Sequence, residues 1–474
     1  MRAPARLFGP GRAVVQCVDC HAGGEPARVV LGGLPWSLPP AACPTAASKR
    51  AWVAAHGGAW TDALLREPRG YPCQNLDIVF SPPPDGGDTA DTGTGADAAA
   101  AEETLQYVIV EHAGVLPLFS GHNTLCVATA LLEFGVLRPR ASTPPDAAGA
   151  VVHTFALEAP AGRVRLAARV TADGKAAAVS MRPGCAFVAR RGAPVRIPDA
   201  ATARVRALVG PAAAARLTDP ATGALVVPVD IAFGGMFYAV VDVTVFWPGD
   251  EDGGAAADAA SWMAARPMRL APSQGGVLCE VGEIIKAAAR EQFPTPHPTQ
   301  PGYVGPDILA FRQATAADDA LPCPDAAPAV GPPPVPVPFA DDAAASPAAS
   351  PPPPLHGRNA VVMSNCPLRW DDPATWTGML DRSACGSGTC AVMAVLHDRG
   401  ELRIGQQFCH RSIIGTAFTG RLLGPFAGDD AAAMPAGAVA PEITGSAYVT
   451  QLCQVVVDPL DPLPGGTPLV GDIW

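Results

Sequence analysis

The sequence has no concentration of basic residues and no long uncharged apolar run. Its 474 residues carry a formal net charge of −11, whereas a nucleic-acid footprint needs a clustered basic surface. A membrane span needs roughly 18–20 uncharged apolar residues. The best candidate, Ala224 to Phe246, is interrupted by Asp230 and Asp242 and indicates paired strands instead. We therefore expect a cytoplasmic protein that binds neither nucleic acid nor a membrane.

Nucleotide-binding and hydrolase fingerprints are missing as well. The sequence has no Rossmann glycine motif and no P-loop, and Gly-x-Ser-x-Gly is absent around Ser120. The thirteen cysteines are irregularly spaced and odd in number, which argues against a disulfide framework. The lone Cys-x-x-Cys segment, Cys17 to Cys20, lacks the second pair or the spaced histidines of a zinc site. We expect no metal site and interpret most cysteines as small buried side chains, among them Cys126, Cys185 and Cys453.

The chain is long enough for two domains, and strand-like and helix-like segments alternate along it. This mixture fits α/β or α+β architecture. The expected strands are Val14–Val18, Val29–Leu31, Val108–Glu111, Val164–Val170, Ala177–Met181, Val226–Ile231 and Tyr238–Val245. The expected helices are Ala46–His56, His122–Phe134, Val281–Glu291 and Gly388–Arg399.

Low-complexity stretches rich in Pro, Ala, Gly and Asp interrupt this pattern near residues 81–103, 322–354 and 427–441. Such segments bury little apolar surface and usually form surface loops. We expect all three to decorate a smaller catalytic core.

Two short stretches, far apart in the sequence, have the same layout. One is Ser120-Gly121-His122-Asn123-Thr124, and the other is Cys385-Gly386-Ser387-Gly388-Thr389; each runs into an apolar helical segment. A helix N-terminus presents unpaired N–H groups and a partial positive charge, so it attracts carboxylates. The pair of stretches therefore predicts two helix starts that hold one anionic substrate.

Each stretch begins with a side chain that can carry a proton. The helix end is expected to lower the pKa of Cys385 and favour its thiolate, a competent base for a carbon acid. Ser120 is a poor base without an activator, and His122 could orient it, polarise it or contact the substrate. The alternative is that Ser120 is an ordinary N-cap and Cys385 a buried thiol.

Other polar and glycine residues have two interpretations each. Asp381 could bind a substrate ammonium or serve as a turn residue. His21 and Glu25 could line a site or form a structural turn, and Gly234-Gly235 could permit close packing beneath the site.

Taken together, these motifs resemble the proline racemase superfamily, which includes 4-hydroxyproline epimerases and trans-3-hydroxy-L-proline dehydratases. They occur in family order across nearly the whole chain. The matching segments are Asp19 to Val30, Glu67 to Gly70, Ser120 to Thr124, Asp230 to Tyr238, Asp381 to Thr389, Ser412 to Gly415 and Gly445 to Tyr448.

The resemblance implies a cofactor-independent enzyme with the α+β, diaminopimelate-epimerase-like fold. That fold has two pseudo-symmetric α/β halves, each a curved sheet around a central helix, with the active site in the cleft between them. We assign residues 1–178 plus 446–474 to the first half and 179–445 to the second. We leave a homodimer open.

The resemblance also implies the roles of individual residues. Ser120 and Cys385 fall on the two catalytic positions, and the backbone N–H groups of Gly121, His122, Gly386 and Ser387 would hold the substrate carboxylate. His122 and Asp381 would contact the ring nitrogen, and His297 would also face the substrate.

One departure from the family decides the expected reaction. The family's racemases carry cysteine at both catalytic positions, and here the first is Ser120. Two-base racemisation needs a proton acceptor and a proton donor on opposite faces, so plain proline racemisation is disfavoured. We expect a trans-3-hydroxy-L-proline dehydratase that gives pyrroline-2-carboxylate, although the family's dehydratases replace the second cysteine, by threonine. The alternatives are a 4-hydroxyproline 2-epimerase, with Ser120 activated by His122, and a non-catalytic protein that binds proline derivatives.

Overall fold

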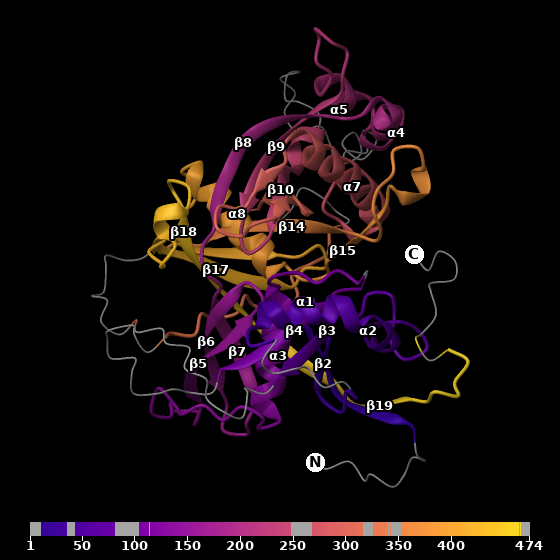
Figure 1. Cartoon of the computed structure of the whole chain (residues 1–474). Helices are drawn as coiled ribbons and strands as arrows, with labels where there is room; N and C mark the ends of the chain where they lie inside the picture. The colour runs from indigo at the N-terminus through magenta and orange to yellow at the C-terminus, as the bar shows by residue number, and fades with distance from the viewer. Residues whose placement is uncertain are drawn as a thin grey trace. The chain divides into compact units, whose positions relative to one another are not determined.

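The computed structural model divides the chain into two compact units (Figure 1). It describes residues 11–35, 43–80, 104–112, 114–247, 268–315, 326–339, 342, 352–463 and 465. Unit 1 comprises Met1–Met181, Val337–Ala345 and Ser446–Trp474, and unit 2 comprises Arg182–Pro336 and Ser346–Gly445. Unit 1 is therefore built from the beginning, a middle piece and the end of the chain.

The strands of unit 1 surround one buried helix, α3 (Gly121–Glu133), which contacts β1, β2, β3 and β19. β1 (Ala13–Ala22) pairs antiparallel with both β2 (Glu25–Gly32) and β19 (Ala447–Val457). β3 (Leu76–Phe80) runs parallel to β2 and antiparallel to β4 (Leu105–Val110), which is parallel to β5 (Val151–Ala159). The remaining elements are β6 (Gly162–Val170), β7 (Ala176–Arg182), α1 (Ala46–His56) and α2 (Gly58–Leu65).

Unit 2 repeats this plan around α8 (Gly386–Asp398), which contacts β8, β9, β10, β17 and β18. A second helix, α7 (Gly275–Gln292), contacts β8, β10 and β13 to β15. The strands are β8 (Phe187–Arg196), β9 (Val226–Phe233), β10 (Phe237–Asp242), β13 (Ile308–Ala314), β14 (Leu355–Ser364), β15 (Gly378–Leu380), β16 (Gln407–Arg411), β17 (Ala417–Pro425) and β18 (Val439–Gly445). β10–β13 and β14–β16 are parallel pairs, and the consecutive pairs β8–β9, β9–β10, β13–β14, β14–β15, β16–β17 and β17–β18 are antiparallel.

The smaller elements of unit 2 lie between these strands in sequence. They are α4 (Asp199–Val209), α5 (Pro211–Arg216), β11 (Thr295–Pro296) and β12 (Val304–Gly305). Both α4 and α7 belong to one apolar cluster with β8, β9 and β13.

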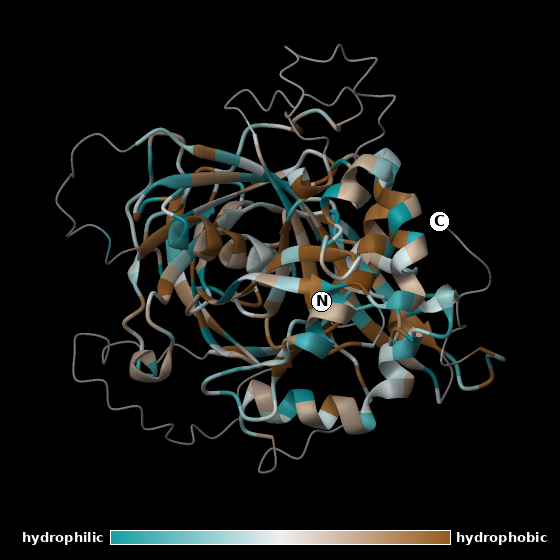
Figure 2. Cartoon of the chain, turned by 90° about the horizontal axis from the view of Figure 1, so that it is seen from above, coloured by the Kyte–Doolittle hydropathy of each residue, from teal (hydrophilic) through white to brown (hydrophobic). Residues whose placement is uncertain are grey.

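The two central helices are apolar on all sides, and this explains why a sheet surrounds each of them. Every residue of α3 from Gly121 to Leu131, and of α8 from Gly386 to Leu396, is buried. Figure 2 shows hydrophobic residues concentrated on strands and inner helices, while the outer helices are hydrophilic on part of their surface. Both central helices are followed by a left-handed glycine, Gly135 (φ 63°) and Gly400 (φ 77°), the usual helix-terminating conformation. The repeat seen in the sequence is therefore a structural repeat.

The expected elements are largely confirmed, with two local differences. Helix Ala46–His56 is found with the bounds expected, and α7 begins six residues earlier than the expected start at Val281. The expected strand Tyr238–Val245 is wrong at its end, because β10 stops at Asp242 and a 3-10 turn, Val243–Phe246, follows. The Asp242 carboxylate accepts a hydrogen bond from Thr244 N at 3.0 Å, which starts this turn. The pairing of β9 with β10 confirms the strand interpretation of the apolar run.

The low-complexity stretches are only partly surface decoration. Residues 81–103 lie outside the described residues. In the second stretch, Val337 and Phe339 are each 2% exposed and pack on Val152 and Ala167, which is why residues 337–345 belong to unit 1 rather than, as expected, to the second half. In the third, Met434 is buried in an aromatic cluster. The average composition of these stretches did not indicate that single apolar residues within them are buried.

None of the helices in the described ranges is both long and apolar enough to cross a membrane.

Candidate active site

The first arm of the candidate site lies at the start of α3 and comprises Ser120, His122, Asn123 and the more distant Asn75. Ser120 occupies the N-cap position, but its side chain makes no capping hydrogen bond. Its hydroxyl instead lies 3.2 Å from His122 Nδ1 and accepts a hydrogen bond from Asn123 Nδ2 at 3.1 Å. The ordinary N-cap interpretation of Ser120 is therefore wrong, and the hydroxyl belongs to a buried polar group.

Asn75 lies against the imidazole of His122 on the side away from Ser120. The Asn75 amide nitrogen donates to Glu25 Oε1 at 3.3 Å and to Pro26 O at 3.1 Å, and these two oxygens identify that end of the amide as the NH₂ group. The same nitrogen lies 3.2 Å from His122 Nε2. The two amide hydrogens of Asn75 are shared among these three acceptors. In the tautomer in which Nε2 accepts one of them, the neutral imidazole carries its proton on Nδ1, directed at the Ser120 hydroxyl.

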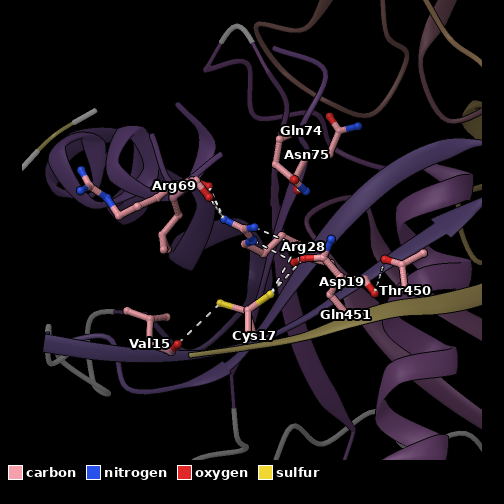
Figure 3. Close-up of polar contacts among 11 residues, drawn as sticks. Val15, Cys17, Asp19, Arg28, Arg69, Gln74, Asn75, Thr450 and Gln451 are labelled. Atoms are coloured by element: carbon pink, nitrogen blue, oxygen red, sulfur yellow. Dashed lines mark hydrogen bonds and ion pairs between the residues drawn. The ribbon is translucent and has the colours of Figure 1, made fainter. Parts of the chain in front are cut away.

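Arg28 forms a buried ion pair with Asp19 (Figure 3) and contacts Asn75 through its backbone. Arg28 donates through Nε and Nη2 to the two carboxylate oxygens of Asp19, both at 2.8 Å. Its Nη1 donates to Leu64 O at 3.0 Å and Arg69 O at 2.6 Å, and its backbone N donates to Asn75 O at 2.8 Å. Arg28 thus links β1, α2 and the segment that carries Asn75.

Glu25 and His21, which follow one another closely in the first motif, have different roles. Glu25 is fully buried and joins the Asn75–His122 chain. His21 Nδ1 accepts from Gly24 N at 3.2 Å and its ring stacks on Tyr448. Glu25 therefore supports the first arm, and His21 forms a turn contact.

The second arm lies at the start of α8 and comprises Cys385, Ser387, Tyr238 and Asp381. Cys385 has φ 57° and ψ 111°, and among the described residues it alone combines a side chain with positive φ. Such a backbone is strained for a residue other than glycine and persists only where its surroundings fix it. Three hydrogen bonds do so: Cys385 N to Ser383 Oγ at 3.0 Å, Asn359 Nδ2 to Ala384 O at 2.7 Å, and Thr389 Oγ1 to Cys385 O at 2.7 Å.

The thiol of Cys385 lies beside two hydroxyl groups. Its sulfur is 3.3 Å from the Tyr238 hydroxyl and 3.9 Å from Ser387 Oγ, and those two oxygens are 2.7 Å apart. Burial raises the pKa of Cys385 well above its ordinary value, and the Asp381 carboxylate raises it further. Hydrogen bonds from Tyr238, the Gly388 backbone and Ser387 act in the opposite direction and are outweighed.

The expected lowering of the Cys385 pKa by the helix end is therefore wrong. Loss of hydration disfavours a buried thiolate by more than the helix N-terminus and the hydroxyl contacts stabilise it. In this state Cys385 carries its proton.

Two glycines allow the close packing of the second arm. A Cβ at Gly234 would lie 2.3 Å from Ser387 O and 2.4 Å from Ala391 N, so β9 can approach α8 only without a side chain there. A Cβ at Gly388 would lie 3.1 Å from the Cys385 sulfur. The expected role of Gly234 beneath the site is confirmed.

Asp381 and His297 were both expected to face a substrate. Asp381 is 2% exposed, and its Oδ1 accepts from Ser383 N at 2.7 Å, so it makes the turn contact while its charge acts on Cys385. His297 lies in an aromatic cluster with Phe187, Phe233, Phe237 and Tyr303. Burial lowers its pKa. A substrate contact of either residue stays a prediction.

The structure thus groups the predicted residues by unit. Ser120, Gly121 and His122 are adjacent in unit 1, and Asp381, Cys385, Gly386 and Ser387 are adjacent in unit 2. The four residues Gly121, His122, Gly386 and Ser387 open their helices, where backbone N–H groups have no intrahelical acceptor. No group of three or more His, Cys, Asp and Glu side chains that could hold a metal occurs in the described part of the chain.

Three contributing residues were missed as site residues by sequence reasoning. Asn123 and Tyr238 stand inside recognised motifs, so a signal existed for both. Asn75 lies outside every motif, and nothing in its sequence neighbourhood indicates a contact with His122.

The fold and the two arms define an α+β enzyme with two related halves, each presenting a proton-carrying side chain where its buried helix begins. The model of the family described as proline racemase matches residues 17–210 and 373–467, more than half of the chain. The chain belongs to the proline racemase family.

Relatives match over nearly the full length. The chain is 26% identical to a proline racemase of Clostridioides difficile over 452 residues, covering 95% of this chain and 97% of the relative. It is 26% identical to 4-hydroxyproline 2-epimerase 1 of Rhizobium rhizogenes over 470 residues, covering 98% of this chain and 97% of the relative. The predicted enzyme class and family are confirmed.

Two solved structures share the fold. One is a probable proline racemase from Agrobacterium radiobacter with bound carbonate, with a TM-score of 0.63, 25% identity and coverage of 96% of both chains. The other is a hydroxyproline epimerase from Agrobacterium vitis with bound trans-4-hydroxy-L-proline, with a TM-score of 0.62, 25% identity and coverage of 96% of this chain and 95% of that chain. The predicted α+β fold class is confirmed.

Proposed function

We propose that this chain moves the α-proton of a hydroxyproline, and that 4-hydroxyproline 2-epimerisation is the reaction its geometry supports best. The observation that carries this proposal is that Ser120 Oγ accepts a hydrogen bond from Asn123 Nδ2 and lies 3.2 Å from His122 Nδ1, which we propose as its second donor. The sequence alone favoured dehydration, because Ser120 looked inactive. The buried donors change that order.

Two hydrogen-bond donors make a hydroxyl a better proton donor, because they stabilise the oxyanion that remains. With both donors directed at its oxygen, the proton of Ser120 is available for a third group. Ser120 would then deliver a proton to a carbanion at Cα and leave an alkoxide held by His122 and Asn123. The side chain that was a weak base becomes a usable acid.

Cys385 would take the α-proton from the opposite face. Its raised pKa requires that substrate binding promote the thiolate, and the positive ring nitrogen of a proline substrate would do so by its charge. N–H groups at a helix start would stabilise the negative charge that develops on the substrate carboxylate. Epimerisation requires both arms to act on opposite faces of one Cα.

The substrate class is supported by the relatives. One of them is named a 4-hydroxyproline 2-epimerase, and a solved structure with the same fold holds trans-4-hydroxy-L-proline. For this chain the hydroxyproline substrate remains our proposal.

Dehydration of trans-3-hydroxy-L-proline is the second candidate, and one observation favours it. The Tyr238 hydroxyl is 3.3 Å from the Cys385 sulfur, and burial raises the pKa of Tyr238 well above its ordinary value, so it keeps its proton. It could protonate a departing C3 hydroxide after Cys385 has taken the α-proton. The product would be water and pyrroline-2-carboxylate.

Incubation in D₂O separates the two reactions. The full-length enzyme is given trans-4-hydroxy-L-proline and, separately, trans-3-hydroxy-L-proline, and the products are followed by NMR. Deuterium at Cα with the hydroxyl retained and a new diastereomer identifies the epimerase. An imine that reacts with o-aminobenzaldehyde identifies the dehydratase, and an enzyme that exchanges no α-proton on either substrate contradicts the proposal.

Two variants test whether Ser120 and Cys385 carry out the proton transfers. Ser120→Ala should abolish formation of the new diastereomer, and Cys385→Ala should lower turnover by about 10²-fold or more. Cys390→Ala is the matched control, because Cys390 is buried in the body of α8 and belongs to neither arm. Unchanged epimerisation in Ser120→Ala would remove Ser120 from the mechanism.

A further inference from the structure

Two cysteines of unit 1 face each other across neighbouring strands. Cys17 on β1 stands directly opposite Cys453 on β19 in the antiparallel register. Directly opposed residues point to the same face of a sheet, with Cα atoms roughly 4.5–5.5 Å apart. A disulfide needs a Cα separation of roughly 4.4–6.8 Å, so either type of antiparallel position meets this requirement.

The two thiols share one environment but differ in exposure. Cys17 is 4% exposed and belongs to an apolar cluster with Val15 and Val30, and Cys453 packs against the same cluster. Cys453 is only half-buried, which corrects its interpretation as a buried side chain. Its Sγ donates to Asp19 Oδ2 at 3.6 Å. The Cys17 thiol donates to Val15 O at 4.0 Å (Figure 3).

Cys20, the other half of the Cys-x-x-Cys segment, has no such partner. It lies three residues beyond Cys17 on β1, and successive side chains of a strand point to opposite faces. The residues across from Cys20 are Val449 on β19 and Ala27 on β2. Cys20 therefore provides an internal control, since no thiol stands opposite it on either neighbouring strand and the thiol that interacts with it is Cys126 of the buried helix α3.

We propose that Cys17 and Cys453 form an oxidation site that reacts with a small disulfide and closes into a disulfide between β1 and β19. The half-buried Cys453 thiolate attacks a disulfide such as oxidised glutathione, releasing one thiol and leaving a mixed disulfide on Cys453. The Cys17 thiolate then attacks the Cys453 sulfur and releases the second thiol. Two protein thiols are oxidised, and one small disulfide is reduced to two thiols.

The surroundings make this reaction slow and specific. Burial raises the pKa of Cys17 to about 12, and burial also raises that of Cys453, while the nearby Arg28 guanidinium opposes both shifts. Only a small fraction of Cys17 and Cys453 is present as thiolate near neutral pH, so both react slowly with oxidants. Closure is favoured once Cys453 carries the mixed disulfide, because the strand pairing already holds Cys17 beside it.

The bond would join the first and last strands of unit 1. A cross-link between residues distant in sequence stabilises chiefly by restricting the unfolded chain, and the effect grows with the length of the loop that it closes. The loop from Cys17 to Cys453 contains all of unit 2. We therefore expect oxidation to raise the thermal midpoint of unit 1.

The test treats the full-length wild-type protein with oxidised glutathione at mildly alkaline pH, alkylates free thiols and maps peptides without reduction. We expect a cross-linked peptide containing Cys17 and Cys453, a loss of two hydrogens from the intact mass, reversal by dithiothreitol and a higher thermal midpoint. Cys453→Ser should show neither the cross-link nor the rise, and Cys20→Ser should show both.

Three results would overturn the proposal: full recovery of Cys17 and Cys453 as separately alkylated thiols, a mixed disulfide that persists on Cys453 in the folded protein, or a cross-link of Cys17 to another cysteine. Each is read from the wild-type chain, so the conclusion does not depend on whether a variant folds.

Discussion

At the scale of single residues, both arms carry a proton, and their surroundings tune that proton by different means. Ser120 has an ordinary extended backbone (φ −144°) and is tuned by side chains that donate to it. Cys385 has a left-handed backbone and is tuned by burial, a nearby carboxylate and hydroxyl groups. The Ser120 hydroxyl, which accepts hydrogen bonds, and the protonated Cys385 thiol both require activation by the substrate. The reaction should therefore depend on residues that never touch the substrate.

Asn75 is the residue whose replacement best tests this dependence. Asn75→Ala removes the amide next to His122 Nε2, so the tautomer with its proton on Nδ1 loses that support. An unsatisfied buried partner costs about 1–3 kcal/mol, and we expect kcat to fall roughly ten- to hundredfold with a smaller change in KM. ¹⁵N NMR of the histidine rings should show His122 changing tautomer. Loss of activity without that change would mean that Asn75 acts only through folding.

The pH dependence of Cys385 modification follows from its raised pKa. Because alkylating agents react with the thiolate, inactivation of the free enzyme by iodoacetamide should keep accelerating above pH 9 instead of levelling off near neutrality. A substrate analogue should protect the enzyme. Cys390→Ala controls for modification of the neighbouring thiol, and a plateau below pH 8 would contradict the protonated resting state.

The residue scale is also where sequence reasoning was least complete. The helix starts at Ser120 and Cys385 were predictable, because a small residue, a glycine and an apolar run are local signals. The pKa of Cys385 was predicted in the wrong direction, because its burial depends on residues brought together from distant segments, such as Tyr238. Asn75 could not be found, because its contact with His122 exists only in three dimensions.

At the scale of elements, the approach of β9 to α8 sets the position of the second arm. In Gly234→Ala the new methyl group would meet backbone atoms of Ser387 and Ala391, which cannot rotate away as a side chain could. We expect a loss of about 1–3 kcal/mol in unfolding free energy and a larger proportional loss of kcat. Gly276→Ala in α7, where a Cβ meets nothing within 4 Å, is the control and should be neutral or slightly stabilising. Equal behaviour of the two variants in denaturation and kinetics would contradict this account.

β3 carries a carboxyl group that should make stability depend on pH. Both oxygens of Asp77 are buried without a hydrogen-bond partner in the described part of the chain, and burial raises its pKa well above the ordinary value, with Glu111 adding to the shift. As pH rises above 3.8, the ordinary pKa of an aspartate carboxyl, the unfolded chain loses the proton first, so stability falls until the folded pKa is reached. The loss is about 1.4 kcal/mol per pH unit within that window.

Asp77→Asn keeps the shape of the side chain and removes this titration. The variant should be more stable than the wild type at pH 7, and the difference should shrink towards pH 4. Urea denaturation across that range measures it. A difference that grows as pH falls would show that Asp77 is ionised in the folded state.

Element bounds were predictable wherever a pattern was long and regular, as in Ala46–His56. They failed where one side chain redirects the backbone, as Asp242 does at the end of β10. The burial of Val337 and Phe339 was hidden by their proline-rich surroundings, because composition averages over the two residues that matter.

At the scale of the whole molecule, unit 1 depends on both ends of the chain. β1 takes hydrogen bonds from β19, and the apolar cluster on one face of β1 includes Val455. Removing residues 446–474 should therefore leave unit 1 without a stable core, while unit 2 retains all of its own segments. We expect the truncated chain to lose activity and to show one unfolding transition fewer in calorimetry. Hydrogen exchange should locate the lost protection in unit 1, and normal protection there would contradict the prediction.

The pairing of β1 with β19 also has a consequence for biosynthesis. A ribosome releases β1 first, but its partner strand emerges only after every residue of unit 2 has been made. Unit 2 can mature as a nearly continuous piece, whereas the N-terminal segment must wait with its apolar side chains uncovered for most of translation. The nascent chain therefore offers chaperones a prolonged target at its leading end, and synthesis speed should influence yield through that segment.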